Sequence, residues 1–86
     1  MKRVDVLNAD IHDAITKTIA GIDRALKKHG KGAYASSREA LGVIRGEYRE
    51  YEKEVDKRNM KRQKEELIDL AAATIFAIAC IDKMDY

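Results

Sequence analysis

Residues 70–81 form an uncharged run of twelve residues that is apolar at every position except Thr74. The run is rich in alanine and isoleucine, which together with its lack of proline and glycine favours an α-helix. A helix that is apolar on all sides has to be covered on all sides. Crossing a membrane takes about 20 such residues, so the run is too short to do so. It therefore needs other helices around it, and a partner subunit is the simplest additional cover.

A first amphipathic helix is predicted between residues 4 and 28. Its apolar side chains recur every three or four positions, which places them in one stripe along a helix. Gly30 follows a basic last turn and is a natural C-terminal cap. The stripe consists of Val4, Leu7, Ile11, Ile15, Ile19, Ile22 and Leu26.

Two more helices are predicted downstream. Ser36 and Glu39 have capping-box spacing and start a helix that runs to about Val55. A third helix is expected over residues 60–83. We place the centre of the turn near Arg58. Neither proline nor glycine marks a turn there, so one continuous helix through residue 59 is the alternative.

The predicted fold is all-α, with residues 1–86 forming a single domain. We expect a three-helix up-down bundle in which the second and third helices form a central antiparallel hairpin. A chain this short has a thin core, and small helical proteins often add buried surface by associating. Completion of the bundle in a homodimer or homotetramer is therefore part of the prediction.

The charge balance and the cysteine content limit the binding partners and the cellular compartment that we expect. The chain has 17 basic and 15 acidic residues, and the net charge of +2 gives no overall drive toward nucleic acid or a membrane. The single cysteine, Cys80, excludes an internal disulfide and fits a reducing compartment. The first residues lack an apolar core of signal-peptide length. We expect a cytoplasmic protein.

Two pairs of carboxylates stand out in the second and third helices. Glu47 and Glu50 are three residues apart, and so are Glu66 and Asp69. On a helix this spacing puts both members of a pair on one face. The same spacing occurs at two other places in this acidic chain, so spacing alone is weak evidence for a site. The positions of the two pairs in the hairpin carry more weight.

In a hairpin centred on Arg58, positions that sum to 116 lie at the same height. Glu47 is then level with Asp69, and Glu50 with Glu66. Asp69 stands between apolar residues and is expected to be buried, where an unpaired carboxylate is costly. Four converging carboxylates repel one another unless cations hold them, and hard oxygen ligands suit Mg²⁺ or Mn²⁺. An ion pair between Glu54 and Arg62 is expected closer to the turn.

The motif formed by these acids resembles that of the MazG-like all-α nucleoside triphosphate pyrophosphohydrolases. Glu47-x-x-Glu50 is followed by fifteen residues and then by Glu66-x-x-Asp69-Leu-Ala-Ala-Ala. The family's metal motif is likewise ExxE, a spacer and ExxD. The preceding segment, from His29 to Ile44, also looks like the phage and bacterial branch of the family. The resemblance covers about residues 28–82, and many members carry a second glutamate where this chain has Gly46.

The resemblance implies Mg²⁺-dependent hydrolysis of a nucleoside triphosphate, ribo or deoxy, to its monophosphate and pyrophosphate. It assigns the metal, Mg²⁺ or Mn²⁺, to Glu47, Glu50, Glu66 and Asp69. Glu50 is the preferred base for the attacking water. Basic residues near the turn are the predicted contacts for the outer phosphates. They are Lys57, Lys61 and Arg62.

Two other readings of the sequence lead to different functions. In the first, the apolar run is a dimer seam and the chain is a non-catalytic helical interaction module. In the second, the basic residues between 57 and 64 bind nucleic acid. The acids on either side of this segment, Glu54, Glu65 and Glu66, argue against a continuous basic stripe and hence against the nucleic-acid reading.

Overall fold

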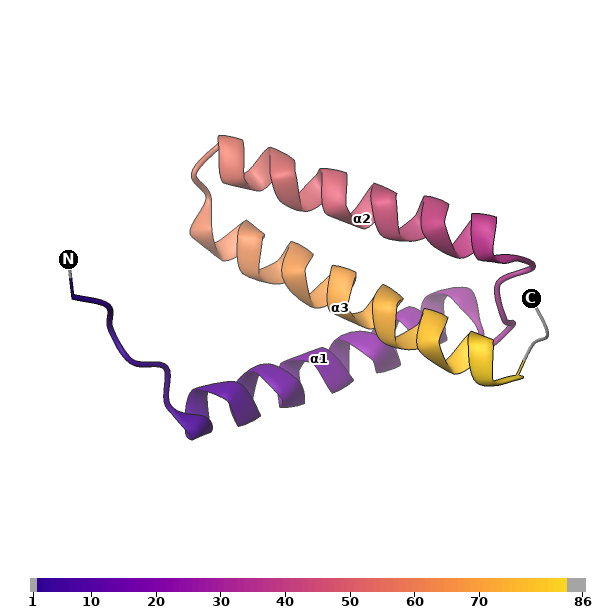
Figure 1. Cartoon of the computed structure of the whole chain (residues 1–86), viewed down its shortest axis with the longest axis horizontal. Coiled ribbons are helices and arrows are strands. Elements are labelled where there is room, and N and C mark those ends of the chain that lie inside the picture. Colours follow the sequence, from indigo (N-terminus) through magenta and orange to yellow (C-terminus); the bar gives the residue numbers. More distant parts are fainter. Residues whose placement is uncertain (1, 84–86) are drawn as a thin grey trace.

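The computed structural model describes residues 2–83 and consists of three α-helices joined by short connections (Figure 1). The helices are α1 (Asn8–His29), α2 (Ser37–Asp56) and α3 (Met60–Lys83). No strand occurs between residues 2 and 83. The prediction of an all-α fold with three helices is confirmed.

The first helix begins later than predicted, at Asn8 rather than at residue 4. The backbone N–H of Leu7 donates a hydrogen bond to Oδ2 of Asp10 at 2.9 Å, which caps the helix at this point. Upstream, Val4 is 93% exposed and touches no apolar surface that would favour another helical turn. Val4 and Leu7 therefore belong to the extended N-terminal segment and its junction with α1, not to the apolar stripe.

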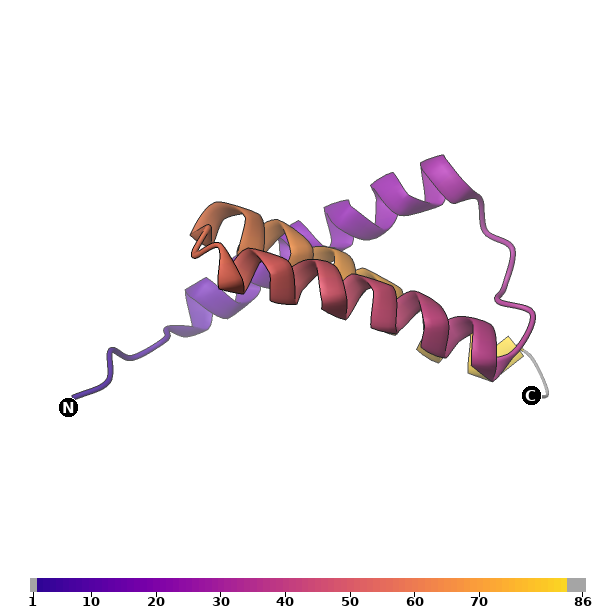
Figure 2. The same ribbon diagram turned by 90° about the horizontal axis from the view of Figure 1, so that it is seen from above.

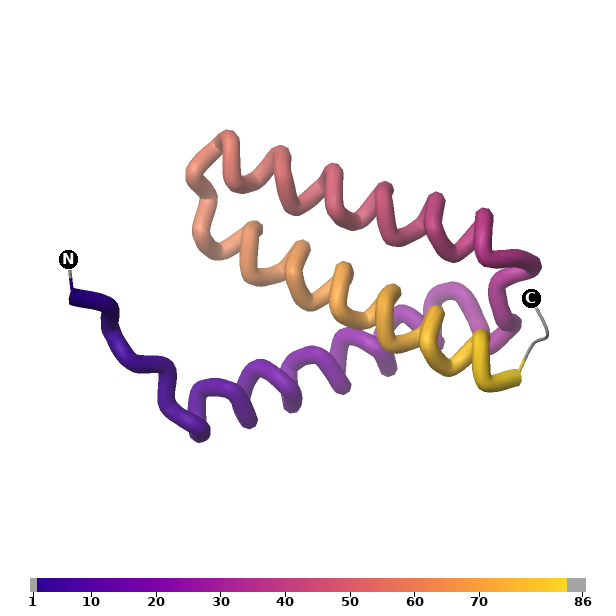
Figure 3. Tube along the Cα trace, viewed as in Figure 1, coloured from indigo at the N-terminus to yellow at the C-terminus, as the bar shows by residue number. Residues whose placement is uncertain are grey.

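The second and third helices form an antiparallel hairpin (Figures 1 and 3). Arg58 takes the left-handed conformation, with φ of 57°. Its N–H donates to the carbonyl of Val55 at 3.0 Å, and the N–H of Asn59 donates to the carbonyl of Glu54 at 3.1 Å. These two bonds make a Schellman motif, in which left-handed backbone ends a helix. The turn is therefore centred on Arg58, as predicted, although glycine is absent.

The predicted helix caps are present. The hydroxyl of Ser36 accepts the N–H of Glu39 at 3.2 Å at the start of α2. Gly30 ends α1 with φ of 80°, and its N–H donates to the carbonyl of Leu26 at 2.8 Å. The start of α3 has an additional cap, since Oδ1 of Asn59 accepts the N–H of Arg62 at 3.1 Å. Local sequence signals thus account for where the helices stop and start.

The first helix packs on α3 and crosses it obliquely, so that its C-terminal half diverges from the hairpin (Figure 2). Within the helices described, α1 makes no close backbone approach to α2. The crossing occurs where Gly21 of α1 is buried against Ile68 of α3. A Cβ atom on Gly21 would lie only 2.7 Å from Cγ2 of Ile68. The missing side chain is what allows the two helices to come this close.

The buried core is small and lies mainly between α2 and α3. It consists of Ala40, Ala72, Ala73, Ala77 and Cys80. The buried position of Cys80 agrees with a structural role for this free thiol. The other side of the apolar run is uncovered, because Ile75, Ile78 and Ile81 are between 46% and 61% exposed.

The chain is extended for its size. It exposes 7224 Å² of surface, whereas a compact monomer of this mass exposes about 5,100 Å². Its radius of gyration is 14.6 Å, against about 12 Å for a compact domain of the same length. Among residues 2–83, no helix combines the length and apolarity needed to cross a membrane.

Candidate metal centre

Three of the predicted acids converge between α2 and α3. Glu47 of α2 and Glu66 and Asp69 of α3 each place one carboxylate oxygen within 4.8 Å of the others. Glu66 and Asp69 come from adjacent turns of one helix, and the hairpin brings Glu47 to their level. The predicted pairing of heights about Arg58 thus produces an acidic triad, defined here as Glu47, Glu66 and Asp69.

The three carboxylates of the triad differ in how far they are buried. Glu66 is buried, Glu47 is half-buried and Asp69 is exposed. The expectation that Asp69 is buried is wrong. Glu66 points toward α2, whereas Asp69, about 60° further around α3, points toward the side where α1 diverges from the hairpin. That side is open, so Asp69 remains accessible to solvent.

Burial and mutual repulsion act on two members of the triad. Burial raises the pKa of Glu47, and the negative charges of Asp69, Glu66 and Glu50 raise it further, while His29 lowers it. Burial is also the main cause of the raised pKa of Glu66, with Asp69 adding to it. A cation at this position would remove both penalties at once, because it offsets the repulsion and replaces the lost water.

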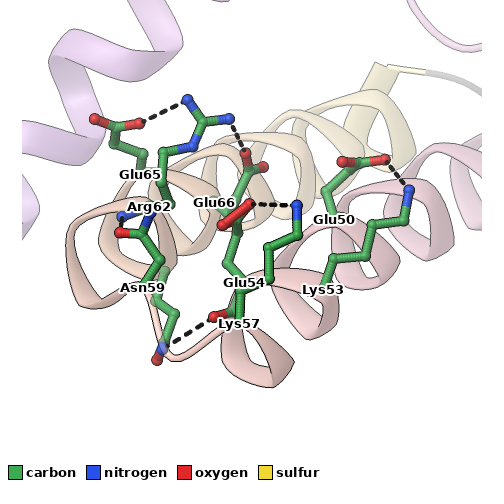
Figure 4. Close-up of polar contacts among 9 residues, drawn as sticks. Glu50, Lys53, Glu54, Lys57, Asn59, Arg62, Glu65 and Glu66 are labelled. Carbon is green, nitrogen blue, oxygen red and sulfur yellow. Dashed lines mark hydrogen bonds and ion pairs between the residues drawn. The ribbon is translucent and has the colours of Figure 1, made fainter.

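Glu50 lies beside the triad but outside it. Its carboxylate is close enough for its charge to raise the pKa of both Glu47 and Glu66. It is exposed, and its Oε1 forms an ion pair with Nζ of Lys53 at 3.4 Å (Figure 4). The roles predicted for Glu50, as a ligand and as a base, stay predictions.

Figure 4 shows Lys57 and Arg62 near the turn, where Arg62 reaches two acids of its own helix. Its Nη1 lies 3.5 Å from Oε2 of Glu65, and its Nη2 lies 3.5 Å from Oε1 of Glu66. Lys57 lies 3.8 Å from Oε1 of Glu54. The expected pair between Glu54 and Arg62 is therefore wrong, since Glu54 pairs with Lys57 and Arg62 pairs with acids of its own helix.

Glu54 is the second buried carboxylate of the hairpin. It is 8% exposed, and its Oε2 atom is buried without a hydrogen-bond partner among the described residues. Its charge also contributes to the raised pKa of Glu66. The two buried carboxylates, Glu54 and Glu66, therefore lie on the side of the triad that is nearer the turn. Each is partly neutralised by an ion pair, Glu54 with Lys57 and Glu66 with Arg62.

A cleft of about 550 Å³ opens on the exposed side of the triad, between α1 and the hairpin. Glu47 and Asp69 form part of one wall. The residues on α1 that line the opposite wall went unnoticed in the sequence, because an ordinary amphipathic helix gives no sign of which polar residues face a site. The residues that line the cleft from outside the predicted motif include Arg24, Lys28, His29, Tyr34 and Phe76.

The residues predicted to contact phosphate do not line the cleft. Lys57, Lys61 and Arg62 belong to the turn end of the hairpin and are not among the residues that line the cleft. Lys61 is exposed. Contact between these three residues and a phosphate group stays a prediction.

Comparison of the chain with protein-family models, with curated proteins and with solved structures finds no match in any of the three.

Proposed function

We propose that this protein is a Mg²⁺-dependent hydrolase that converts a nucleoside triphosphate, ribo or deoxy, into its monophosphate and pyrophosphate. The observation that carries the proposal is the convergence of Glu47, Glu66 and Asp69 at the edge of an open cleft. The resemblance of the ExxE and ExxD motifs to those of MazG-like pyrophosphohydrolases supports the same reaction. The cleft volume lies within the range of about 300–1,000 Å³ that is usual for small-molecule sites.

The acids present fit the proposed metal. Mg²⁺ prefers carboxylate oxygens, keeps several waters and binds substrate phosphates as well, so it needs few protein ligands. The buried Glu66 and the half-buried Glu47 are held together at an electrostatic cost that a divalent cation would remove. When bound, Mg²⁺ supplies neutralisation of the phosphate charges and a more acidic water.

The acidic residues have two separate roles in the proposed reaction. Glu47, Glu66 and Asp69 hold the metal, and Asp69 faces the cleft through which the substrate enters. Glu50 accepts the proton of the attacking water, because it lies close to the triad without belonging to it. The water oxygen bonds to the α-phosphorus as the bond to the bridging oxygen breaks, and pyrophosphate leaves.

The test is incubation of the protein with each nucleoside and deoxynucleoside triphosphate in the presence of Mg²⁺. Pyrophosphate and monophosphate are measured separately from orthophosphate. Turnover that yields pyrophosphate is expected for the parent, at least a hundredfold less for Asp69→Asn, and unchanged turnover for Glu65→Gln. A folded parent that turns over none of the nucleotides would refute the proposed reaction.

We also propose that a second copy completes the up-down bundle, by covering an apolar face on the side away from the cleft. Residues nine apart on a helix lie on opposite sides. Ile15 is nine residues before Arg24, and Leu67 is nine before Phe76, while Arg24 and Phe76 both line the cleft. Ile15 and Leu67 are 52% and 44% exposed.

The exposed area supports association. The protomer exposes roughly 2,000 Å² more than a compact chain of its mass, and a standard interface takes about 800 Å² from each partner. The extended N-terminal segment, residues 2–7, accounts for part of this excess. Association also serves the alternative function, a non-catalytic interaction module, in which the triad has no role.

A further inference from the structure

The two walls of the cleft carry opposite charges. Glu47 and Asp69 lie on the hairpin wall, and Arg24, Lys28 and His29 lie on the α1 wall. The acids alone would repel the phosphate chain of a nucleotide. A cationic wall on the other side of the same cleft supplies the charge that an anionic ligand needs.

The helix geometry explains why these cations face the cleft. Gly21, Arg24 and Lys28 follow one another at steps of three and four and therefore share one face of α1. Gly21 packs against Ile68, so this face is turned toward α3. Nη2 of Arg24 lies 3.6 Å from the position that a Cβ of Gly21 would occupy. The guanidinium group thus folds back toward the helix crossing, where Asp69 directly follows Ile68 in the chain.

Arg24 and Lys28, the arginine and lysine of α1 that line the cleft, are not neutralised in the way that the cations at the turn are. Lys57 and Arg62 form ion pairs with Glu54 and Glu66. No ion pair within residues 2–83 engages Arg24 or Lys28. His29 on the α1 wall also lowers the pKa of Glu47, so the two walls lie close enough for their charges to interact.

The cleft also has an aromatic end. The rings of Tyr34 and Phe76 meet edge to face, with centroids 5.1 Å apart and an interplanar angle of 79°. Both side chains line the cleft and are half-buried. A ring pair of this kind offers a flat apolar contact to a planar ligand group.

We propose that Arg24 and Lys28 of α1 bind the phosphate chain of the substrate across the cleft from the acidic triad, with the nucleobase against Tyr34 and Phe76. The inference rests on the proposed function for the identity of the ligand. It assigns the phosphate contacts to α1 in place of the residues of the hairpin turn. A guanidinium and an ammonium group on one wall match the multiple oxygens of a polyphosphate.

The test compares two sets of cations by kinetics. Arg24→Gln and Lys28→Gln are each expected to raise KM about tenfold, and the double variant more, with a smaller change in kcat. Lys27→Gln is the matched control, since Lys27 neighbours Lys28 in sequence but does not line the cleft. The variants Lys57→Gln and Lys61→Gln are expected to leave KM within twofold. The reverse pattern, with KM raised only by the turn variants, would overturn the assignment.

A binding measurement separates this inference from the proposed reaction. Titration calorimetry with inorganic tripolyphosphate and Mg²⁺ should give binding to the parent and at least tenfold weaker binding to the Arg24→Gln/Lys28→Gln variant. Binding that depends on these residues without any nucleotide turnover would sustain the inference and refute the reaction. Turnover with an unchanged KM in the double variant would support the proposed reaction and refute the assignment of Arg24 and Lys28. A parent that does not bind tripolyphosphate would refute the inference.

The aromatic end is tested with the same calorimetry. A nucleotide whose α,β-bridging oxygen is replaced by a methylene group should bind the parent more tightly than tripolyphosphate does. Phe76→Leu keeps most of the apolar volume and should reduce that difference at least threefold, without changing the affinity for tripolyphosphate. Equal affinities of the parent for the two compounds would contradict the placement of the base.

Discussion

Gly21 of α1 lies so close to Ile68 of α3 that a Cβ atom on Gly21 would come within 2.7 Å of Cγ2 of Ile68. This contact sets the crossing of the two helices, and Asp69 is the next residue after Ile68 along α3. The position of α1, and with it the cationic wall of the cleft, therefore depends on the absence of a single methyl group.

Replacement of Gly21 by alanine is expected to lower the free energy of unfolding by about 1–3 kcal/mol, because the new methyl group overpacks the crossing. The control is Gly42→Ala in α2, where no atom lies within 4 Å of the added Cβ. That change should stabilise the protein by about 0.5–1 kcal/mol through helix propensity. Urea unfolding of both variants measures the difference. Equal stabilisation by the two alanines would contradict the close packing at Gly21.

Mg²⁺ is expected to stabilise the folded protein, because the triad proposed to bind it exists only when the hairpin is formed. At a Mg²⁺ concentration a hundred times Kd, the gain is about 2.7 kcal/mol. Urea midpoints with and without Mg²⁺ measure it. Asp69→Asn should abolish the gain, and Glu65→Gln should keep it. If the parent gains nothing from Mg²⁺ or Mn²⁺, the triad is not a metal site and the interaction-module reading takes its place.

Without a metal, stability should fall as the pH rises above about 4.5, the ordinary pKa of a glutamate side chain. The pKa values of Glu47 and Glu66 are raised on folding, so the folded protein binds these protons more tightly than the unfolded chain does. Deprotonation across this window therefore costs stability. Thermal unfolding in EDTA at several pH values checks the slope.

Two controls define the source of this slope. Glu47→Gln should flatten it, because the amide does not titrate, and Glu65→Gln should not. Added Mg²⁺ should also remove the loss, since it binds the deprotonated carboxylates. Stability that rises with pH over the same window would contradict the proposed repulsion within the triad.

The turn offers a stabilising substitution. Arg58 holds a left-handed conformation with φ of 57°, which costs a residue with a side chain about 1–2 kcal/mol. Arg58→Gly is expected to raise the free energy of unfolding by about 0.5–1 kcal/mol after the greater flexibility of the unfolded chain is included. The same change at Asp56, the last residue of α2, should lower it by a similar amount. Chemical unfolding compares the two, and a destabilised Arg58→Gly variant would argue against the Schellman turn.

Lysine on the exposed apolar face should break the proposed assembly. Light scattering coupled to gel filtration is expected to give the parent at least twice its protomer mass of 9.7 kDa. Ile15→Lys and Ile78→Lys should shift the mass toward the protomer, because each buries a charge in the interface. Val6→Lys is the control, since Val6 is 71% exposed but lies in the extended N-terminal segment. A monomeric parent would refute the assembly.

Most of the helical architecture is readable from local chemistry. The Ser36 cap, the glycine stop at Gly30 and the apolar periodicities act between residues a few positions apart, so they operate in any tertiary context. The heights of residues in the hairpin follow from them as well, because a short turn at Arg58 places residues that are equally far from it at the same level. This is why the convergence of Glu47 with Glu66 and Asp69 agrees with the predicted heights.

The exposure of the acids and the residues that line the cleft depend on the oblique crossing of α1, which only the tertiary structure shows. The crossing opens one side of α3, which leaves Asp69 exposed and Glu66 buried although both share the predicted acidic face. It also brings Arg24 and Lys28 to the cleft. The crossing is set by a contact between residues 47 positions apart, Gly21 and Ile68, and no pattern within a single helix encodes it. The sequence by itself therefore determined the helices and the acidic motif, and only the packing determined which side of that motif is accessible to a ligand.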